Sequence, residues 1–177
     1  TADMAMELAK INANNSMSKD VSVFYLETRN ADQKLNNISI DRLKDKCGTK
    51  ALPTAELTLN GVPAMLLGEK GKGVKTISTL FNITRAHNAI GCVANMHQMI
   101  QLTKDYAVKR SAFAKTINEH PLHLQTLADL DTEYLAGFLL AFKVVELLGK
   151  EENNVTNTDE YALFRLLLPL AKLYTAK

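Results

Sequence analysis

The sequence changes character at a glycine-rich segment, GEKGKG (residues 68–73), and this change limits the folds open to the chain. Before the segment, short runs of strand-forming residues alternate with Gly, Pro and Asn, which interrupt regular structure; after it, apolar residues follow long stretches of the chain at helical spacing. The order is therefore strands first and long helices second. This order is typical of an α+β or two-domain layout.

The first third of the chain predicts a fragment of an antiparallel sheet. A polar stretch at 12–20 predicts a loop between the first two strands, and the Asn60-Gly61 pair predicts a hairpin-like turn that closes the fragment. The expected strands are residues 1–11, residues 21–28, ISIDRL and AELTL.

The remainder of the chain predicts three helices that form an up-and-down bundle. The first runs from residue 74 to about Arg110 and would be about 50 Å long at 1.5 Å per residue. The second begins near Glu119 and ends at Gly149; the third contains Pro169, which we expect to kink or break it. Three helices with one-sided apolar faces usually need a fourth partner.

Helical spacing of apolar residues defines the face that each helix is expected to bury. These positions are Val74, Ile77, Phe81, Ala86, Ile90, Val93, Met96, Ile100 and Ala107 in the first helix, Leu127, Leu130, Tyr134, Phe138, Phe142, Val145 and Leu148 in the second, and Tyr161, Phe164, Leu167, Ala171 and Tyr174 in the third.

Composition indicates a folded chain and excludes several classes of protein. The 177 residues are 46% hydrophobic, which excludes a disordered chain, and no apolar stretch is long enough to span a membrane. The 21 Lys and Arg residues against 19 Asp and Glu residues give a net charge of +2, too small for a dedicated nucleic-acid binder. Cys47 and Cys92 have no C-x-x-C spacing, and no His or Glu spacing predicts a metal site.

Three features of the sequence could hold an anion. The GEKGKG segment has the glycines of a phosphate-binding loop but does not match G-x-x-x-x-G-K-[ST], and a hinge between sheet and helix explains it equally well. Arg85 lies mid-helix among apolar residues, where a guanidinium needs a partner. Arg110 lies at the end of the same helix, where it could simply complement the helix dipole.

Three segments resemble the middle sheet and the helical domain of acyl-CoA dehydrogenases. They are LKDKCGTKALPTAELTLNGVPAMLLGEKGKGVKTI, NITRAHNAIG and DYAVKRSAFAKTINEHPLHLQTLADL. The similarity follows the family's order and spacing over about residues 1–177, and KDKCGTKALPTAEL and EHPLHL are most similar to the branch related to the bacterial protein AidB. The resemblance implies that residues 1–70 are part of the middle β-barrel domain and residues 71–177 part of the C-terminal helical domain.

The resemblance also implies a cofactor site at the end of the first long helix. In the family, an Arg-x-x-Phe-Gly motif reaches across a dimer interface to the FAD of the neighbouring subunit. The corresponding residues here are Arg110, Ser111, Ala112, Phe113 and Ala114. A planar guanidinium can pair bidentately with phosphate oxygens, which suits Arg110. Ala114 replaces the usual glycine, and Ala112 offers only backbone contacts where the family often has a hydroxyl.

Further positions follow from the same resemblance. His120 and Pro121 occupy the place of a His-Gln pair near the cofactor, although proline lacks the glutamine's amide. Asn82, Thr84 and Arg85 match the stretch of the first helix that lines the acyl-CoA cavity. Some family members have the catalytic glutamate at the position of Thr84, and most have it later in the helical domain. We therefore expect the base to lie outside these residues and assign none of them a catalytic role.

The activity implied by the resemblance is the FAD-dependent α,β-dehydrogenation of a fatty acyl-CoA. A carboxylate removes the α-proton, the flavin accepts the β-hydride, and an electron-transfer flavoprotein reoxidises it. The implied assembly is a homodimer or homotetramer. The absence of an initiator Met and of a fourth helix leads us to expect a fragment of a longer flavoenzyme, inactive alone. The parent would be mitochondrial in a eukaryote and cytoplasmic in a bacterium.

Besides a plain helical interaction module, two other functions stay open on the sequence. One is an AidB-like protein that binds flavin and DNA, which would require a basic patch that the charge balance does not favour. The other is a protein that sequesters acyl-CoA without turning it over.

Overall fold

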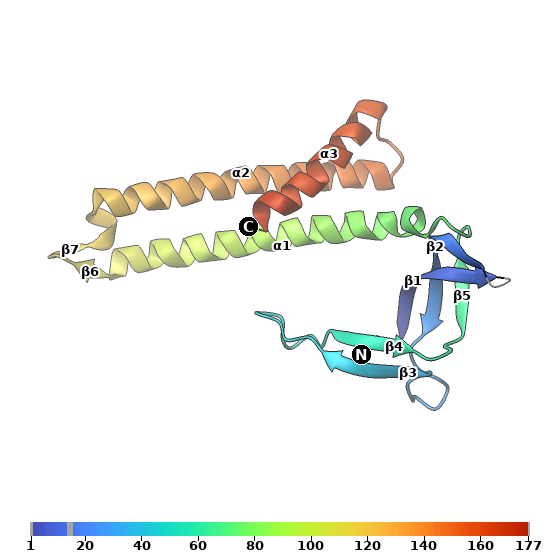
Figure 1. The fold of residues 1–177 in the computed structure, drawn as a ribbon. Helices are drawn as coiled ribbons and strands as arrows, with labels where there is room; N and C mark the ends of the chain where they lie inside the picture. The colour runs from blue at the N-terminus through green and yellow to red at the C-terminus, as the bar shows by residue number, and fades with distance from the viewer. Residues whose placement is uncertain (1, 14–15, 177) are drawn as a thin grey trace. The chain divides into compact units, whose positions relative to one another are not determined.

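A computed structural model describes residues 2–13 and 16–176, and these form two compact units, residues 1–79 and residues 80–177 (Figure 1). The first unit holds five strands and the start of a long helix, and the second holds the rest of that helix and two more. The α+β class expected from the sequence is confirmed.

The first unit contains two small antiparallel sheets. One has the strand order β1 (Met4–Ala13), β2 (Ser16–Glu27) and β5 (Ala64–Leu67); the other pairs β3 (Ile38–Leu43) with β4 (Ala55–Leu59). The predicted loop at 12–20 is wrong, because β1 and β2 extend through most of it and pair as far as Ala13 with Ser16. Cross-strand backbone hydrogen bonds form whatever the polarity of the side chains, so polar residues continue a ribbon that the composition assigned to a loop.

The turn at Asn60-Gly61 is present, but it does not close a hairpin. Gly61 has φ +77, as a tight turn requires, yet β4 pairs with β3 while β5 pairs with β2. A local Asn-Gly signal specifies a reversal of the chain and not the strand with which the next segment pairs. The turn therefore connects the two sheets.

The glycine-rich segment packs against β2. Gly68 and Gly71 have φ +70 and +79, and the Gly71 amide donates to the buried Ser22 Oγ at 2.9 Å. A Cβ on Gly73 would lie 2.7 Å from the Val21 carbonyl oxygen, closer than a Cβ can approach. The glycines thus allow a turn and a close contact between the first helical residue and a strand, which accounts for this segment as a structural connection.

The long helices are α1 (Gly73–Lys109), α2 (Pro121–Glu152) and α3 (Thr158–Thr175). The predicted end of the second helix at Gly149 is wrong, because Asn154 takes the left-handed conformation, φ +56, that terminates it. Of the expected kink or break at Pro169, the break is absent, since α3 is continuous through it, and the kink stays a prediction. Pro169 and Arg165, four residues earlier, are both exposed, so water can solvate the carbonyl that lacks an amide partner.

Small residues let the three helices pack closely around three larger side chains, Leu147, Phe164 and Leu168. The core consists of Ala86, Ala89 and Val93 of α1, Ala141, Val144 and Leu147 of α2, and Phe164, Leu168 and Ala171 of α3. The predicted faces are right for part of this set and wrong for Val74, Phe81, Leu130, Phe142, Tyr161 and Tyr174, which are exposed. The predicted faces include Ala86 and Ala171 but miss Ala89 and Ala141, because close helix contact favours small residues at core positions that the spacing did not select.

An ion pair and a capping box stabilise the connection from α2 to α3. Asn157 Oδ1 accepts from the Glu160 amide at 2.9 Å, and Lys150 Nζ lies 2.5 Å from Glu160 Oε1. The ammonium of Lys150 lowers the pKa of Glu160. The ion pair therefore stabilises the fold fully above the ordinary pKa of a glutamate, and this stabilisation is lost as the pH falls through the lowered pKa.

Within residues 2–13 and 16–176, no helix is both long and apolar enough to cross a membrane.

Candidate functional site

The chain between α1 and α2 forms a short hairpin, which we call the tip hairpin (residues 110–120). Its strands β6 (Ser111–Ala112) and β7 (Lys115–Thr116) pair, and the 3-10 helix η1 (Ile117–Glu119) leads into α2. Phe113 and Ala114, between the strands, have φ +51 and +63. Two successive left-handed residues are the arrangement of a type I′ hairpin turn, in which Asn and Gly are usual.

This turn is strained, because neither central residue is glycine. The left-handed conformation costs an ordinary L-residue about 1–2 kcal/mol. We expect Ala114→Gly to raise the free energy of unfolding by about 1 kcal/mol, measured by urea denaturation. Ala162→Gly, at an exposed position inside α3, is the matched control and should lower stability by about 1 kcal/mol. A destabilising Ala114→Gly would show that the turn is not strained.

Several contacts fix the tip hairpin at the end of the helix pair. The Ile117 amide donates to the Arg110 carbonyl at 2.9 Å, and His120 Nε2 lies 3.1 Å from the Ala112 carbonyl oxygen. The rings of Phe113 and His120 meet edge to face with centroids 6.3 Å apart. Phe113 itself is 94% exposed. The fold thus brings together all six residues predicted at the cofactor: Arg110, Ser111, Ala112, Phe113, His120 and Pro121.

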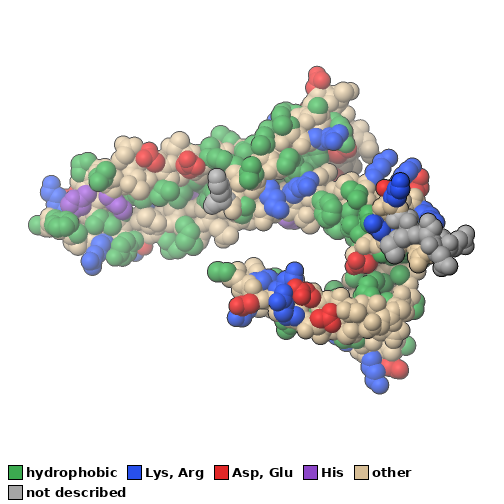
Figure 2. Space-filling model, viewed as in Figure 1, with side chains coloured by type: hydrophobic (Ala, Val, Ile, Leu, Met, Phe, Trp, Pro, Cys, Tyr) green, Lys and Arg blue, Asp and Glu red, His purple; other side chains and the backbone are tan. Residues whose placement is uncertain are grey.

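The tip hairpin is positively polarised. In the part of the chain that the structure describes, no carboxylate lies within ion-pair distance of exposed Arg110, whereas the neighbouring Lys109 pairs with Asp105 at 2.6 Å. The α2 N-terminus begins beside it with Pro121, and the side chain of His120 does not cap it. Histidine and basic side chains gather at this end of the helix pair (Figure 2). A guanidinium next to a helix N-terminus is suited to an anion.

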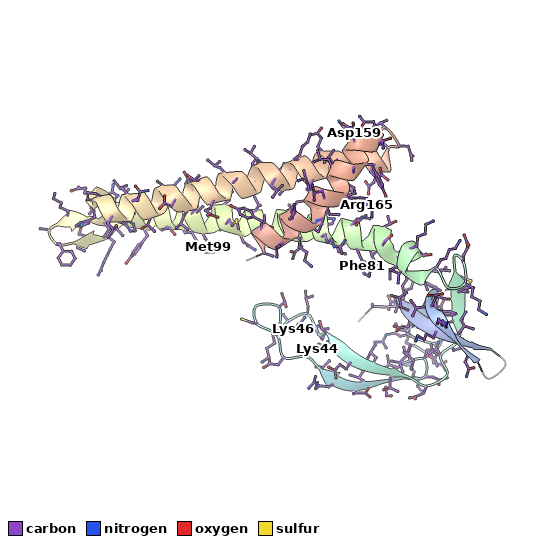
Figure 3. All side chains as sticks on the ribbon, turned by 45° about the horizontal axis from the view of Figure 1, so that its top comes forward. Lys44, Lys46, Phe81, Met99, Asp159 and Arg165 are labelled. Atoms are coloured by element: carbon purple, nitrogen blue, oxygen red, sulfur yellow. The ribbon has the colours of Figure 1, made fainter. Side chains whose placement is uncertain are left out.

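The residues predicted at the substrate lie far from the tip. Asn82, Thr84 and Arg85 occupy an early part of α1, close to the exposed Phe81 (Figure 3). Arg85 precedes Arg110 by about 25 residues, which is roughly 38 Å along a helix. The chain therefore does not bring the two predicted groups together.

The early part of α1 is ordered by the core and leaves Arg85 without an ionic partner. Ala86, the next residue, is 2% exposed in the core, and Arg85 is half-buried. Among the described residues no carboxylate is within ion-pair distance of its guanidinium. Thr84 Oγ1 donates to the Phe81 carbonyl at 3.0 Å. A half-buried cation of this kind can take an anionic or hydrogen-bonding ligand.

A family comparison decides the identity of this arrangement. The family model "Acyl-CoA dehydrogenase, C-terminal domain" matches residues 71–177. The chain belongs to the acyl-CoA dehydrogenase family.

Relatives of this acyl-CoA dehydrogenase chain include proteins that are considerably longer. Acyl-CoA dehydrogenase family member 11 of Caenorhabditis elegans is 41% identical over 180 residues, covering 99% of the chain and 29% of the relative. The structure of C. elegans ACDH-11 in complex with C11-CoA matches with TM-score 0.93 and 40% identity, covering 98% of the chain and 30% of that protein. The apo form of Bd2924 matches with TM-score 0.93 and 45% identity, covering 99% of the chain and 35% of that protein.

More distant members share the fold and part of the sequence. Putative acyl-CoA dehydrogenase AidB of Escherichia coli is 26% identical over 157 residues, covering 89% of the chain and 28% of AidB. The structure of acyl-CoA dehydrogenase complexed with FAD from Bacillus anthracis matches with TM-score 0.80 at 23% identity, covering 98% of the chain and 30% of that protein. The chain thus spans about a third or less of the length of these relatives.

Two polar groups of this acyl-CoA dehydrogenase chain could not be predicted from the sequence. Asn118 Oδ1 and His123 Nε2, at and just after the tip hairpin, are buried without a hydrogen-bond partner. Their spacing matches no motif, so only the fold could reveal them. No group of three potential metal ligands exists among the described residues.

Proposed function

We propose that the protein carrying this chain is an FAD-dependent acyl-CoA dehydrogenase that oxidises the Cα–Cβ bond of a fatty acyl-CoA and passes the electrons to an electron-transfer flavoprotein. Residues 1–70 would belong to its middle β-domain and residues 71–177 to its C-terminal helical domain. Membership of the family and the likeness to a protein that binds C11-CoA support this proposal. The unpaired guanidinium of Arg110 in the tip hairpin is the observation that carries it.

The tip hairpin fits the anionic part of FAD. Arg110 supplies a guanidinium with no carboxylate of the described residues within ion-pair distance, and the α2 N-terminus adds a partial positive charge. Ser111 offers a hydroxyl and backbone groups, Ala112 backbone groups, and exposed Phe113 an aromatic ring. The fit to FAD is supported by the B. anthracis family member, which is complexed with FAD. When bound, FAD supplies the hydride acceptor of the reaction.

The separation of the two residue groups favours a homodimer or homotetramer. Arg85 and Arg110 are roughly 38 Å apart along α1 at 1.5 Å per residue, too far for both to meet one reacting centre. We propose that the tip hairpin serves the cofactor of a neighbouring subunit, while Asn82, Thr84 and Arg85 line the acyl-CoA cavity of their own. Both sites are then complete only in the assembly.

The described residues can bind and orient the substrate but are not assigned the proton transfer. Thr84 has a hydroxyl, already donated to a backbone carbonyl, and no ionisable group near neutral pH. The half-buried guanidinium of Arg85 can hold an anionic or carbonyl group of the thioester. A carboxylate elsewhere in the protein would then remove the α-proton.

The DNA-binding alternative finds little support. The net charge is only +2, because the numbers of basic and acidic side chains are nearly equal. Several of these side chains form ion pairs, such as Arg42 with Glu56 at 2.7 Å. Identity to AidB is 26%, below the 41% to the C. elegans relative. Sequestration of acyl-CoA without turnover predicts binding without reduction of the flavin, which the experiment below measures.

Arg110 provides the test. We expect Arg110→Ala to reduce the FAD content of the purified protein by about tenfold or more, because it removes a bidentate phosphate contact, and Arg110→Lys to retain an intermediate amount. The measurement is flavin absorbance per protein, followed by anaerobic bleaching with acyl-CoAs of different chain length. Arg165→Ala, on the exposed face of α3 (Figure 3), is the control and should leave FAD content unchanged. Full FAD content in Arg110→Ala would defeat the assignment, and wild-type protein that binds acyl-CoA without bleaching would favour sequestration.

A further inference from the structure

We propose that His120 is a positioning residue, which holds the tip hairpin in the shape that presents Arg110 and Phe113. The expected effect of His120 on FAD binding rests on the proposed function. Its effect on the conformation of the tip hairpin can be tested separately. It differs from the expectation that His120 contacts the cofactor directly.

The imidazole of His120 joins the base of the hairpin to its turn. Its Nε2 lies 3.1 Å from the carbonyl oxygen of Ala112, the residue that precedes the turn. A carbonyl oxygen can only accept, so this contact requires the proton on Nε2. The same ring lies in a T-shaped arrangement with the ring of Phe113, with an interplanar angle of 82° and centroids 6.3 Å apart. One side chain thus contacts both the backbone before the turn and the side chain at its first central position.

The turn needs such a tether because its own sequence opposes it. Phe113 and Ala114 both have left-handed backbones that non-glycine residues disfavour. The ribbon has only two residues on each side, and within the described part of the chain His120 is the sole aromatic partner of Phe113. Exposure of 94% means that no surrounding core holds the Phe113 ring.

His120 is well placed for this role. It immediately precedes α2, a helix anchored by fully buried Val144 and Leu147, so its backbone has a rigid base. Its side chain makes no capping bond to that helix and is therefore available to the hairpin. The cost of the strained turn is thus offset by a contact from the next element of the chain.

Two substitutions distinguish the effect of the hydrogen-bond donor of His120 from the effect of its aromatic ring. His120→Gln places an amide donor close to the position of Nε2, whereas His120→Phe keeps an aromatic ring and removes the donor. His87→Gln, at an exposed position of α1, is the control. Amide hydrogen exchange is measured by mass spectrometry in the protein carrying this chain. The peptide 110–120 reports on the hairpin, and the peptide 135–150 of α2 reports on global stability.

We expect exchange in peptide 110–120 to accelerate about fivefold in His120→Phe, as for loss of one hydrogen bond. His120→Gln should recover most of the protection, and peptide 135–150 should not change. If His120→Phe weakens FAD binding, adding Ala114→Gly should restore part of that binding, because a turn without strain depends less on the contact from His120. A merely structural role in α2 would instead accelerate exchange in both peptides.

The two proposals fail in different ways. Equal exchange of peptide 110–120 in wild type and His120→Phe would overturn the positioning role, even if Arg110→Ala loses FAD. Acceleration confined to that peptide in His120→Phe, with FAD content unchanged in Arg110→Ala, would support the positioning role and reject the cofactor assignment. If both hold, His120→Phe should bind FAD about fivefold more weakly than His120→Gln.

Discussion

Gly73→Ala is expected to lower the free energy of unfolding of the first unit by about 3 kcal/mol, at the upper end for an overpacked site. The added Cβ would lie 2.7 Å from the Val21 carbonyl oxygen and 2.8 Å from the Ser22 carbonyl carbon. Both are backbone atoms of β2, so relief requires the strand or the start of α1 to move. Urea denaturation followed by circular dichroism, with amide exchange in β2 to localise the change, measures the effect.

Two other glycines provide matched comparisons for this change. Gly91 lies mid-helix in the same α1, where an added Cβ would meet nothing within 4 Å, so Gly91→Ala should stabilise by about 1 kcal/mol through helix propensity. Gly71→Ala meets only the Asp20 Cβ at 3.6 Å, and its cost of about 1 kcal/mol comes from φ +79. If Gly73→Ala is as stable as wild type but loses binding of an added nucleotide, the segment is a phosphate loop after all.

The division of the chain into strands and long helices could be predicted because it depends on local pattern. The start of α2 at Pro121 and the strands β3 and β4 follow from residues within one segment. The partner of β5 could not be predicted, because Asn60 and Gly61 determine a reversal whereas pairing with β2 depends on residues about 40 positions away. The end of α2 was wrongly predicted at Gly149, because Asn154 can also adopt the left-handed conformation that ends a helix.

The candidate site was predictable only in part. The motif places Arg110, Phe113 and His120 in one short segment, so their proximity follows from the chain itself. The left-handed turn at Phe113 and Ala114 was hidden, because alanine at this position gives no signal for a positive φ. The hydrogen bond from His120 to Ala112 depends on the path of the hairpin, which no residue pattern specifies.

Phe164→Ala is expected to lower the free energy of unfolding of the helical unit by about 3–5 kcal/mol, as for other buried aromatic residues. Phe164 is 1% exposed and belongs to the core cluster shared by all three helices. Its neighbours in the cluster include several alanines, which are too small to fill the resulting cavity. Phe164→Leu keeps most of the volume and should cost about 1–1.5 kcal/mol.

The same substitution should affect the proposed substrate residues. Ala86 and Ala89 of α1 belong to the Phe164 cluster, and Arg85 directly precedes Ala86. A cavity here should loosen this part of α1 and accelerate amide exchange in residues 80–90, while the tip hairpin, at the other end of α1, keeps its protection. Arg165→Ala is the control on the same helix: it removes an exposed cation–π contact with Tyr161, 5.9 Å from the ring centroid, worth about 0.5–1 kcal/mol. If Phe164→Ala cost no more than Arg165→Ala, α3 would not pack on α1 and α2 through this face, and the core could not be what orders Arg85.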